Sequence, residues 1–164
     1  MISLIVAVAR NGVMGNSHGR FGLPWHISAD LKRFKEMTIE KPLIMGRTSW
    51  QLIGKALPNR HCIMLSRTNA QMAGIETFTS LNEALEAYKN EDEIFVGGGR
   101  EVFKVALPMA DWLFMTEVET DAEGDTLFPA FDRKAYLEVK RERVEAVGET
   151  PAFSWVDYIH QPKG

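Results

Sequence analysis

The chain has 164 residues, 45% of them hydrophobic and 25% charged, a composition typical of one globular domain with a substantial core. A net charge of -3 and a pI of about 5.8 disfavour a nucleic-acid-binding protein, which needs a clustered basic face. The single cysteine, Cys62, excludes an intrachain disulfide and indicates a reducing compartment, so we expect a cytoplasmic protein.

Two further classes are disfavoured by the placement of particular residues. The four histidines are scattered without metal-ligand spacing, so we expect no metal site. The apolar run Ile2–Ala9 is too short to span a membrane, and no basic segment precedes it as in a signal peptide. We therefore expect no membrane partner.

The first half of the chain predicts strands that alternate with helices. Ile2–Ala9 is typical of a strand buried on both faces, and a Gly-rich loop from Asn11 to Trp25 follows it. The stretch 27–38 has the apolar spacing of an amphipathic helix, with Arg33 expected in solvent. The next segments are a strand over 42–45 that ends at Gly46, a helix over 47–53, a turn over 57–59, and strands over 62–66 and 76–78.

The second half continues this alternation and then becomes antiparallel. Its segments are a helix from Ser80 with capping-box spacing to Glu83, a strand over 93–96, a helix over 100–107 stopped by Pro108, a strand over 112–118, and alternating segments over 135–146 and 153–160. We expect one α/β domain over residues 1–164, with a mostly parallel central sheet of about eight strands, a C-terminal antiparallel hairpin and flanking helices.

Two charged residues are candidates for holding a polar ligand. Asp30 shares the apolar side of its helix with Ile27 and Phe34, where a carboxylate is costly unless donors reach it. The alternative is an ordinary acid in the first turn, which complements the helix dipole. Arg60 follows the 57–59 turn and is placed to clamp a substrate carboxylate, with an unpaired surface arginine as the alternative.

Ligands of mostly parallel sheets bind beyond the carboxyl ends of the strands. That rule gathers the residues that follow the expected strands, and the helix of Asp30 starts near the same edge. They are residues 7–15, 46–49, 66–67 and 97–100, together with Thr116.

The triple glycine over 97–99 lies between an expected strand and an expected helix. Glycines there let the backbone approach a ligand, and the helix start offers free N–H groups to a phosphate. Val102 replaces the third glycine of a G-x-G-x-x-G fingerprint, and no P-loop motif occurs, which disfavours an ordinary Rossmann fold and a P-loop kinase. The alternative is a tight turn before a helix.

Arg47 and Arg67 each follow a strand end, beside the hydroxyl residues Thr48, Ser49 and Ser66. If the two strands are neighbours, these residues form a compact site for a phosphate, because guanidinium groups bind phosphate through paired hydrogen bonds. A phosphate held away from a diphosphate is the 2′-phosphate of NADP. Ordinary surface arginines are the alternative.

Taken in order, these segments resemble the dihydrofolate reductase family, in particular its bacterial type, over almost the whole chain. Each motif is short, but their joint order and spacing are specific. The matching segments are 2–9 with 12–15, Leu23-Pro24-Trp25 before Asp30-Leu31 and Phe34, 41–48, Leu57-Pro58-Asn59-Arg60, Gly97-Gly98-Gly99, and 123–126 with Phe128-Pro129.

The resemblance implies NADPH-dependent reduction of 7,8-dihydrofolate to 5,6,7,8-tetrahydrofolate, with hydride transfer to pterin C6 and protonation of N5. It also implies a monomer that binds antifolates of the trimethoprim and methotrexate type. The catalytic residues that it implies are Asp30, Leu23, Trp25 and Thr116. The substrate-binding residues that it implies are Ile5, Asp30, Leu31, Phe34, Ile53, Lys55, Leu57, Arg60, Gly97 and Thr116.

The same resemblance makes NADPH the cofactor and implies a cis peptide between Gly98 and Gly99. The cofactor-binding residues that it implies are Ala7, Met14, Gly15, Asn16, Gly46, Arg47, Thr48, Ser49, Leu65, Ser66, Arg67, Thr79, Gly98, Gly99, Arg100, Glu101, Val102 and Phe103.

The chain departs from the family pattern at three places. The loop between Gly15 and Leu23 is longer than in the usual bacterial pattern, which affects how it closes over the nicotinamide. Phe103 stands where tyrosine is common, and Gly97 replaces a branched aliphatic residue, which is expected to leave more room beside the pterin. We expect the last two changes to weaken trimethoprim-type inhibitors.

Two rival functions remain open from the sequence. One is the pyrimidine reductase of riboflavin synthesis, which shares this fold; the segment 23–25, Asp30 and Arg60 favour folate instead. The other is a nucleotide-binding module without catalysis, in which Asp30 only complements the helix dipole. Activity with dihydrofolate distinguishes the first rival, and binding without turnover identifies the second.

Overall fold

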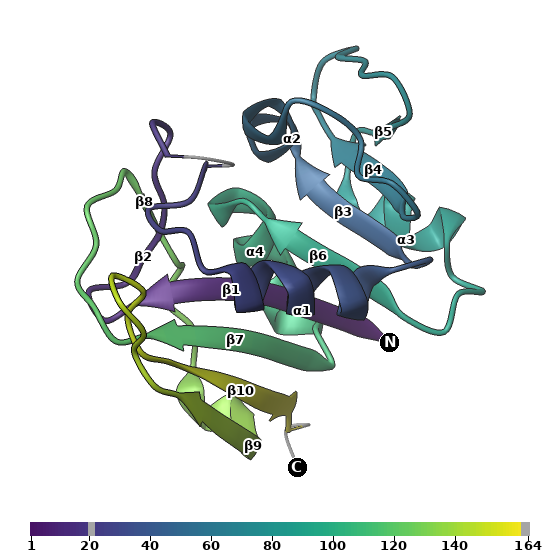
Figure 1. Ribbon diagram of the computed structural model, residues 1–164. Helices are drawn as coiled ribbons and strands as arrows, with labels where there is room; N and C mark the ends of the chain where they lie inside the picture. The colour runs from purple at the N-terminus through teal and green to yellow at the C-terminus, as the bar shows by residue number, and fades with distance from the viewer. Residues whose placement is uncertain (20–21, 162–164) are drawn as a thin grey trace.

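The structure is a computed structural model that describes residues 1–19 and 22–161 (Figure 1). Within these residues the chain forms an eight-stranded sheet, four α-helices and a separate two-stranded ribbon. No helix in this part of the chain has the length and apolar character needed to cross a membrane. The expected domain end at residue 164 and two positions of the long loop, 20 and 21, lie outside the described residues.

Most elements lie where the sequence predicts them. The helices are α1 (Ser28–Thr38), α2 (Arg47–Ile53), α3 (Leu81–Ala87) and α4 (Arg100–Ala106), with short 3-10 turns η2 (Leu107–Met109) and η3 (Arg133–Ala135). The strands are β1 (Ile2–Ala9), β2 (Val13–Gly15), β3 (Pro42–Gly46), β4 (His61–Leu65), β5 (Glu76–Phe78), β6 (Ile94–Gly98), β7 (Trp112–Val118), β8 (Thr126–Leu127), β9 (Tyr136–Val144) and β10 (Phe153–His160).

The large sheet has the strand order β5-β4-β3-β6-β1-β7-β10-β9. All neighbouring strands are parallel except at β10, which runs antiparallel to both β7 and β9. The expected single α/β domain with a C-terminal antiparallel hairpin is therefore confirmed. Because the strands from β5 to β7 are parallel, their carboxyl ends share one edge of the sheet, as the arrowheads in Figure 1 show.

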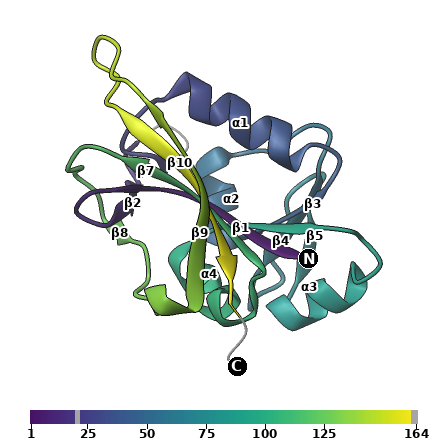
Figure 2. The ribbon, with the colours of Figure 1, turned by 90° about the horizontal axis from the view of Figure 1, so that it is seen from below.

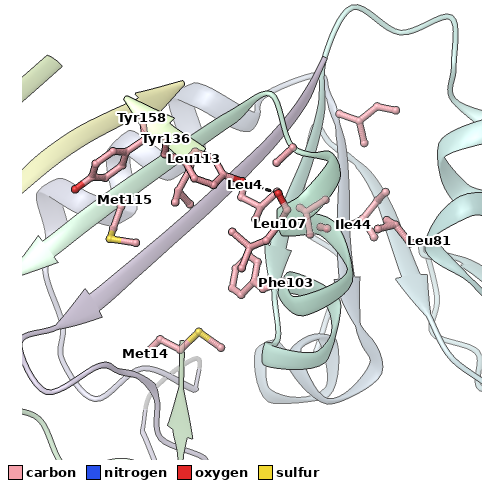
Figure 3. Close-up of a cluster of buried hydrophobic side chains, with 14 of the residues drawn as sticks. Leu4, Met14, Ile44, Leu81, Phe103, Leu107, Leu113, Met115, Tyr136 and Tyr158 are labelled. Carbon is pink, nitrogen blue, oxygen red and sulfur yellow. Dashed lines mark hydrogen bonds between the residues drawn. The ribbon is translucent and has the colours of Figure 1, made fainter. Parts of the chain in front are cut away.

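Helices cover both faces of the sheet, and the strands supply apolar side chains to each. Seen from below, α1 lies on one face and α3 and α4 lie on the other (Figure 2). Leu43, Met64 and Phe95 pack with Trp50 of α2 on the α1 face. The alternate side chains of the same strands pack with Phe103 of α4 in the opposite cluster (Figure 3). Burial on both faces explains why these strands are continuous apolar runs.

Two helix ends differ in detail from the expectation. The Ser80 hydroxyl accepts a hydrogen bond from the Glu83 N–H at 3.1 Å, as a capping box requires. The Glu83 carboxylate, however, accepts from the backbone N–H and hydroxyl of Thr79 rather than from Ser80. The α-helix α4 ends at Ala106, and the chain continues directly into the 3-10 turn η2, which contains Pro108.

Arg33 is not in solvent, contrary to the sequence expectation. Its Nη2 lies 3.0 Å from Oδ1 of Asp157 on β10, and the two side chains are only 20% and 19% exposed. Its guanidinium carbon also lies 5.1 Å from the centre of the Trp155 ring. Periodicity places Arg33 off the apolar side of the helix, but α1 lies over β10, a contact between distant segments that spacing does not show.

The sequence analysis also missed the ribbon formed by β2 and β8. Val13 pairs with Leu127 and Gly15 with Thr126, so the glycine-rich loop is held to the loop after β7. A Cβ at Gly124 would lie 2.3 Å from the Gly15 carbonyl oxygen, so only glycine fits this close approach. Strands of two and three residues carry no readable periodicity.

We predict that alkali destabilises the protein through its three tyrosines. Burial is the first cause that raises the pKa of Tyr88, Tyr136 and Tyr158 from 10.0 to about 12. The native state therefore holds protons that the unfolded chain releases, so the stabilisation is complete below pH 10 and is lost between pH 10 and about 12. Urea unfolding across this window, together with tyrosinate absorbance, measures both effects.

The matched control is Tyr136→Phe, which removes the hydroxyl that donates to the Leu107 carbonyl at 2.6 Å. This variant should be less stable at neutral pH, because a buried acceptor is left unpaired. Its stability should then decline less steeply in alkali. Tyrosines that all titrate near 10 in the folded protein would contradict the prediction.

Candidate active site

A cleft of about 1380 Å³ opens at the carboxyl ends of the parallel strands. It contains every residue that the resemblance assigns to substrate, cofactor or catalysis, except Trp25. Other residues also line the cleft, and the resemblance does not assign them to the site: Val6, Ser17, Gly22, Arg33, Lys35, Met45, Leu52, Pro58, Ser80, Leu81, Asn82, Val105, Asp125 and Thr126. Most of these are sequence neighbours of expected site residues, and that adjacency is the signal by which they were detectable.

Asp30 lies in the first turn of α1 and is held from two neighbouring strands. The Thr116 hydroxyl of β7 donates to Asp30 Oδ1 at 2.6 Å, and the Trp155 indole N–H of β10 donates to the same oxygen at 2.9 Å. Across the described residues, no protein donor bonds to Oδ2. The carboxylate thus keeps one oxygen for a ligand in the cleft, which an acid that only complements the helix dipole does not require.

Trp25 lies outside the cleft. It packs with the buried residues Ile27, Val118 and Phe153 in a small cluster at the start of α1. Its indole therefore helps to seat the helix that carries Asp30. The catalytic role expected of Trp25 stays a prediction.

Arg60 lines the cleft from the segment between α2 and β4, next to the end of α1. Its Nε donates to the Thr38 hydroxyl at 3.2 Å, its Nη1 donates to the Pro58 carbonyl at 2.9 Å, and its guanidinium lies 6.0 Å from the Phe34 ring centre. Burial lowers the pKa of the Arg60 guanidinium, since desolvation disfavours charge. These contacts hold a partly buried cation in the cleft.

The glycine turn at the end of β6 brings backbone to the cleft surface. The peptide between Gly98 and Gly99 is cis, as the resemblance implies, and Gly98 has a φ of 135°, which favours glycine. A Cβ at Gly99 would lie 3.2 Å from the Ser49 hydroxyl oxygen, so a side chain there would crowd α2. Arg100, the first residue of α4, donates to the Leu127 carbonyl at 2.8 Å and fastens the turn to β8.

The two arginines expected to bind a phosphate lie at adjacent strand ends. Arg47 follows β3 and Arg67 follows β4, and these strands are parallel neighbours. Arg47 Nη1 lies 3.3 Å from the hydroxyl of Thr68, which also lies 3.2 Å from the Ser66 hydroxyl. Thr68 was missed by sequence reasoning, although its position directly after Ser66 and Arg67 pointed to it. Cations and hydroxyls here form the compact site that an exposed phosphate needs.

The long loop after β1 is fastened to the loop that carries Asp125. The Ser17 hydroxyl and backbone N–H both donate to the Asp125 carboxylate. The hydrogen bond from Ser17 is the main cause that lowers the pKa of Asp125. Asn16 Nδ2 donates to the Glu123 carbonyl at 3.0 Å, so these three hydrogen bonds hold this wall of the cleft in place.

Gly97 does not leave the empty space expected from the sequence. A Cβ at Gly97 would lie 3.2 Å from Leu43 and 3.3 Å from the Met45 side chain. Met45 is a cleft residue, so its thioether fills the volume that a branched side chain would occupy at position 97. The expectation of more room beside the pterin is therefore wrong, because a neighbouring strand supplies the missing side chain.

The described residues contain no group of three His, Cys, Asp or Glu side chains arranged to hold a metal ion. A cleft that joins a fastened carboxylate, a glycine turn and an arginine–hydroxyl pair defines an α/β enzyme that binds a nucleotide cofactor beside a second ligand.

Comparison with known proteins gives the family. The family model described as "Dihydrofolate reductase" matches residues 1–159. A dihydrofolate reductase of Haemophilus influenzae is 42% identical over 127 residues, covering 77% of this chain and 78% of that protein. One from Neisseria meningitidis is 37% identical over 160 residues, covering 96% and 97%.

A solved structure is also similar. The dihydrofolate reductase from Enterococcus faecalis, complexed with NADP(H) and RAB-propyl, superposes with a TM-score of 0.91 and is 34% identical, covering 99% of this chain and 97% of that one. The chain belongs to the dihydrofolate reductase family.

We predict that Met45 and Gly97 are energetically coupled. Gly97→Ala should cost about 1–3 kcal/mol of stability, because the new methyl group crowds Met45 and Leu43. The same substitution in a Met45→Ala background should cost clearly less, since the thioether no longer occupies the space. Urea unfolding of the four proteins in this double-mutant cycle measures the coupling. An equal cost in both backgrounds would show that Met45 does not fill the site.

Proposed function

We propose that this cleft carries out NADPH-dependent reduction of 7,8-dihydrofolate to 5,6,7,8-tetrahydrofolate, with the residues inferred from the sequence in the roles given below. The single observation that carries the assignment is Asp30. It presents a carboxylate with one free oxygen to a cleft that continues to the glycine turn and the arginine pair. Family membership supports the same reaction.

The cofactor end of the cleft suits NADPH. The Gly98-Gly99 turn lacks the Cβ atoms that would crowd Ser49, so backbone reaches the cleft where a diphosphate binds. Arg47, Arg67 and the hydroxyls beside them suit the adenosine 2′-phosphate. When bound, NADPH supplies the hydride that adds to pterin C6. The other cofactor-binding residues inferred from the sequence line the same channel.

Asp30 orients the substrate and favours its protonated form. Its free oxygen accepts hydrogen bonds from the pterin N3 and 2-amino group, which fixes the ring in the plane of the carboxylate. A negative charge held there stabilises positive charge on the pterin, so N5 gains its proton more easily. Thr116 keeps the carboxylate in place through its 2.6 Å hydrogen bond.

The opposite end of the cleft suits the rest of the folate molecule. Leu31, Phe34, Ile53 and Leu57 supply an apolar channel for the aminobenzoyl ring. Arg60 ends this channel and binds the glutamate α-carboxylate, which also compensates its own partial burial. Antifolates that combine a diaminopyrimidine or diaminopteridine ring with an apolar body suit the same surface.

We also propose that the enzyme is a cytoplasmic monomer. One chain supplies every residue that the proposal uses, so the site needs no second copy. Cys62, buried and free, is compatible with a reducing compartment, and burial raises the pKa of its thiol. Sedimentation of the purified protein measures its oligomeric state.

We predict that Asp30→Asn greatly reduces hydride transfer at neutral pH. The amide removes the negative charge that favours protonation of N5, so the rate should fall by about 100-fold or more. Part of the loss should be recovered in acid, where solvent already protonates the substrate. Single-turnover NADPH oxidation across pH measures the effect. A variant with the original rate at neutral pH would exclude the role proposed for Asp30.

Arg67→Ala tests the specificity for the 2′-phosphate. Loss of the guanidinium should weaken NADPH binding by roughly tenfold and leave NADH binding almost unchanged, because only NADPH carries the extra phosphate. The matched control is Arg10→Ala, since Arg10 is an exposed arginine outside the cleft whose nearest acid is 4.0 Å away. Fluorescence titration gives both affinities, and equal losses for the two nucleotides would contradict the assignment.

A further inference from the structure

Beside the cleft, a row of contacts connects the Asp30 carboxylate to a partly buried ion pair. Trp155 Nε1 donates to Asp30 Oδ1 at 2.9 Å. The Trp155 ring lies against Arg33, whose guanidinium carbon is 5.1 Å from the ring centre. Arg33 Nη2 in turn lies 3.0 Å from Asp157 Oδ1. The row therefore passes from Asp30 on α1 to Trp155 on β10, returns to Arg33 in the next turn of α1, and ends at Asp157 on β10.

We infer that Trp155 is a positioning residue for Asp30, and that the Arg33–Asp157 ion pair holds the indole in place. This inference rests on the proposed function, because it treats Asp30 as the group that grips the substrate. Neither Trp155 nor Asp157 lines the cleft. Trp155 therefore acts through Asp30 and has no contact with the substrate.

The geometry fixes the rotation of the carboxylate. Thr116 and Trp155 are partners in the register between β7 and β10, so their donors approach the same oxygen from adjacent strands. Two charge-assisted bonds on Oδ1 stop rotation about the Cβ–Cγ bond and leave Oδ2 for the ligand. One donor alone would permit the carboxylate to pivot about that single bond.

The indole itself is held on two sides. The Phe153 ring lies 5.3 Å from it in an edge-to-face arrangement, and Arg33 covers part of it. Asp157 fixes Arg33 in this position, and both charged side chains are about four-fifths buried. A guanidinium over an indole face is favourable in its own right. The ion pair thus keeps the N–H aimed at Asp30.

Several charged groups surround this row. They come from α1, β9 and β10, and they line a shallow groove on the outer side of Trp155: Lys32, Arg33, Glu36, Lys140, Glu142 and Asp157. A meaningful test compares variants that keep every one of these charges, so that their effect on Asp30 is the same in each variant.

Trp155→Phe is such a variant, because it removes the indole N–H and keeps an aromatic ring. The matched control is Trp112→Phe, since Trp112 lies on β7, stacks on Phe114 at 5.5 Å and does not contact Asp30. Affinity for a diaminopyrimidine antifolate is measured by calorimetry across pH with the full chain. Binding uses the ionised carboxylate, so the affinity should fall at low pH. This acid limb of the pH profile reports how readily Asp30 takes up a proton.

In Trp155→Phe the acid limb should move to higher pH by about one unit, because a carboxylate that loses a donor is more easily protonated. Hydride transfer at neutral pH should fall roughly tenfold with little change in the KM for NADPH. Arg33→Lys should shift the limb in the same direction by less, because lysine keeps the positive charge but lacks the planar guanidinium that covers the indole. Trp112→Phe should match the original protein in every measurement.

An acid limb unchanged from that of Trp112→Phe would overturn the inference, whereas absence of antifolate binding in the original protein would overturn the proposed function instead. A shift in Trp155→Phe with none in Arg33→Lys would overturn the part assigned to Arg33 and its ion pair. If Trp155→Phe does not fold, the same question is answered by NMR of the original protein labelled with nitrogen-15, in which each tryptophan indole N–H gives its own resonance. The chemical shift of one indole N–H should then change with pH over the same acid range and should not change in Asp30→Asn. If none of the four indole resonances responds to pH in this range, the role of Trp155 is rejected.

Discussion

The hydrogen bonds that two neighbouring strands direct at a single oxygen of Asp30 are the constraint on which the site depends. Thr116 and Trp155 face each other in the sheet register, so the antiparallel placement of β10 beside β7 brings the second donor within reach. A chain that ended its sheet at β7 would hold the acid by one bond. The C-terminal hairpin therefore both completes the edge of the sheet and supplies a donor to Asp30.

The two ends of the cleft follow from the same parallel arrangement. Strands β3, β4 and β6 end side by side, so segments far apart in sequence meet at one edge: the arginine after β3, the hydroxyls after β4 and the glycines at the end of β6. Long apolar strands that are covered on both faces make this edge rigid. Small loops on a rigid sheet then supply the polar groups.

Local signals predicted the elements well and contacts between distant segments poorly. Strand ends, helix starts and the glycine turn are readable because caps, periodicity and turn residues act over a few positions. The partners of Arg33 and the position of Trp25 were not readable, because both depend on where α1 lies over the sheet. The residues in the cleft were found through their order along the chain, and their roles remain proposals.

The glycine at position 97 leaves no side chain of its own on this part of the cleft, and the Met45 side chain lies in its place. Met45 lies beside the glycine on the neighbouring strand β3, so its unbranched thioether forms the surface that a side chain at position 97 would otherwise form. Such a wall adapts to the ring pressed against it. Tolerance of differently shaped ligands in this cleft should therefore depend on position 45 as much as on position 97.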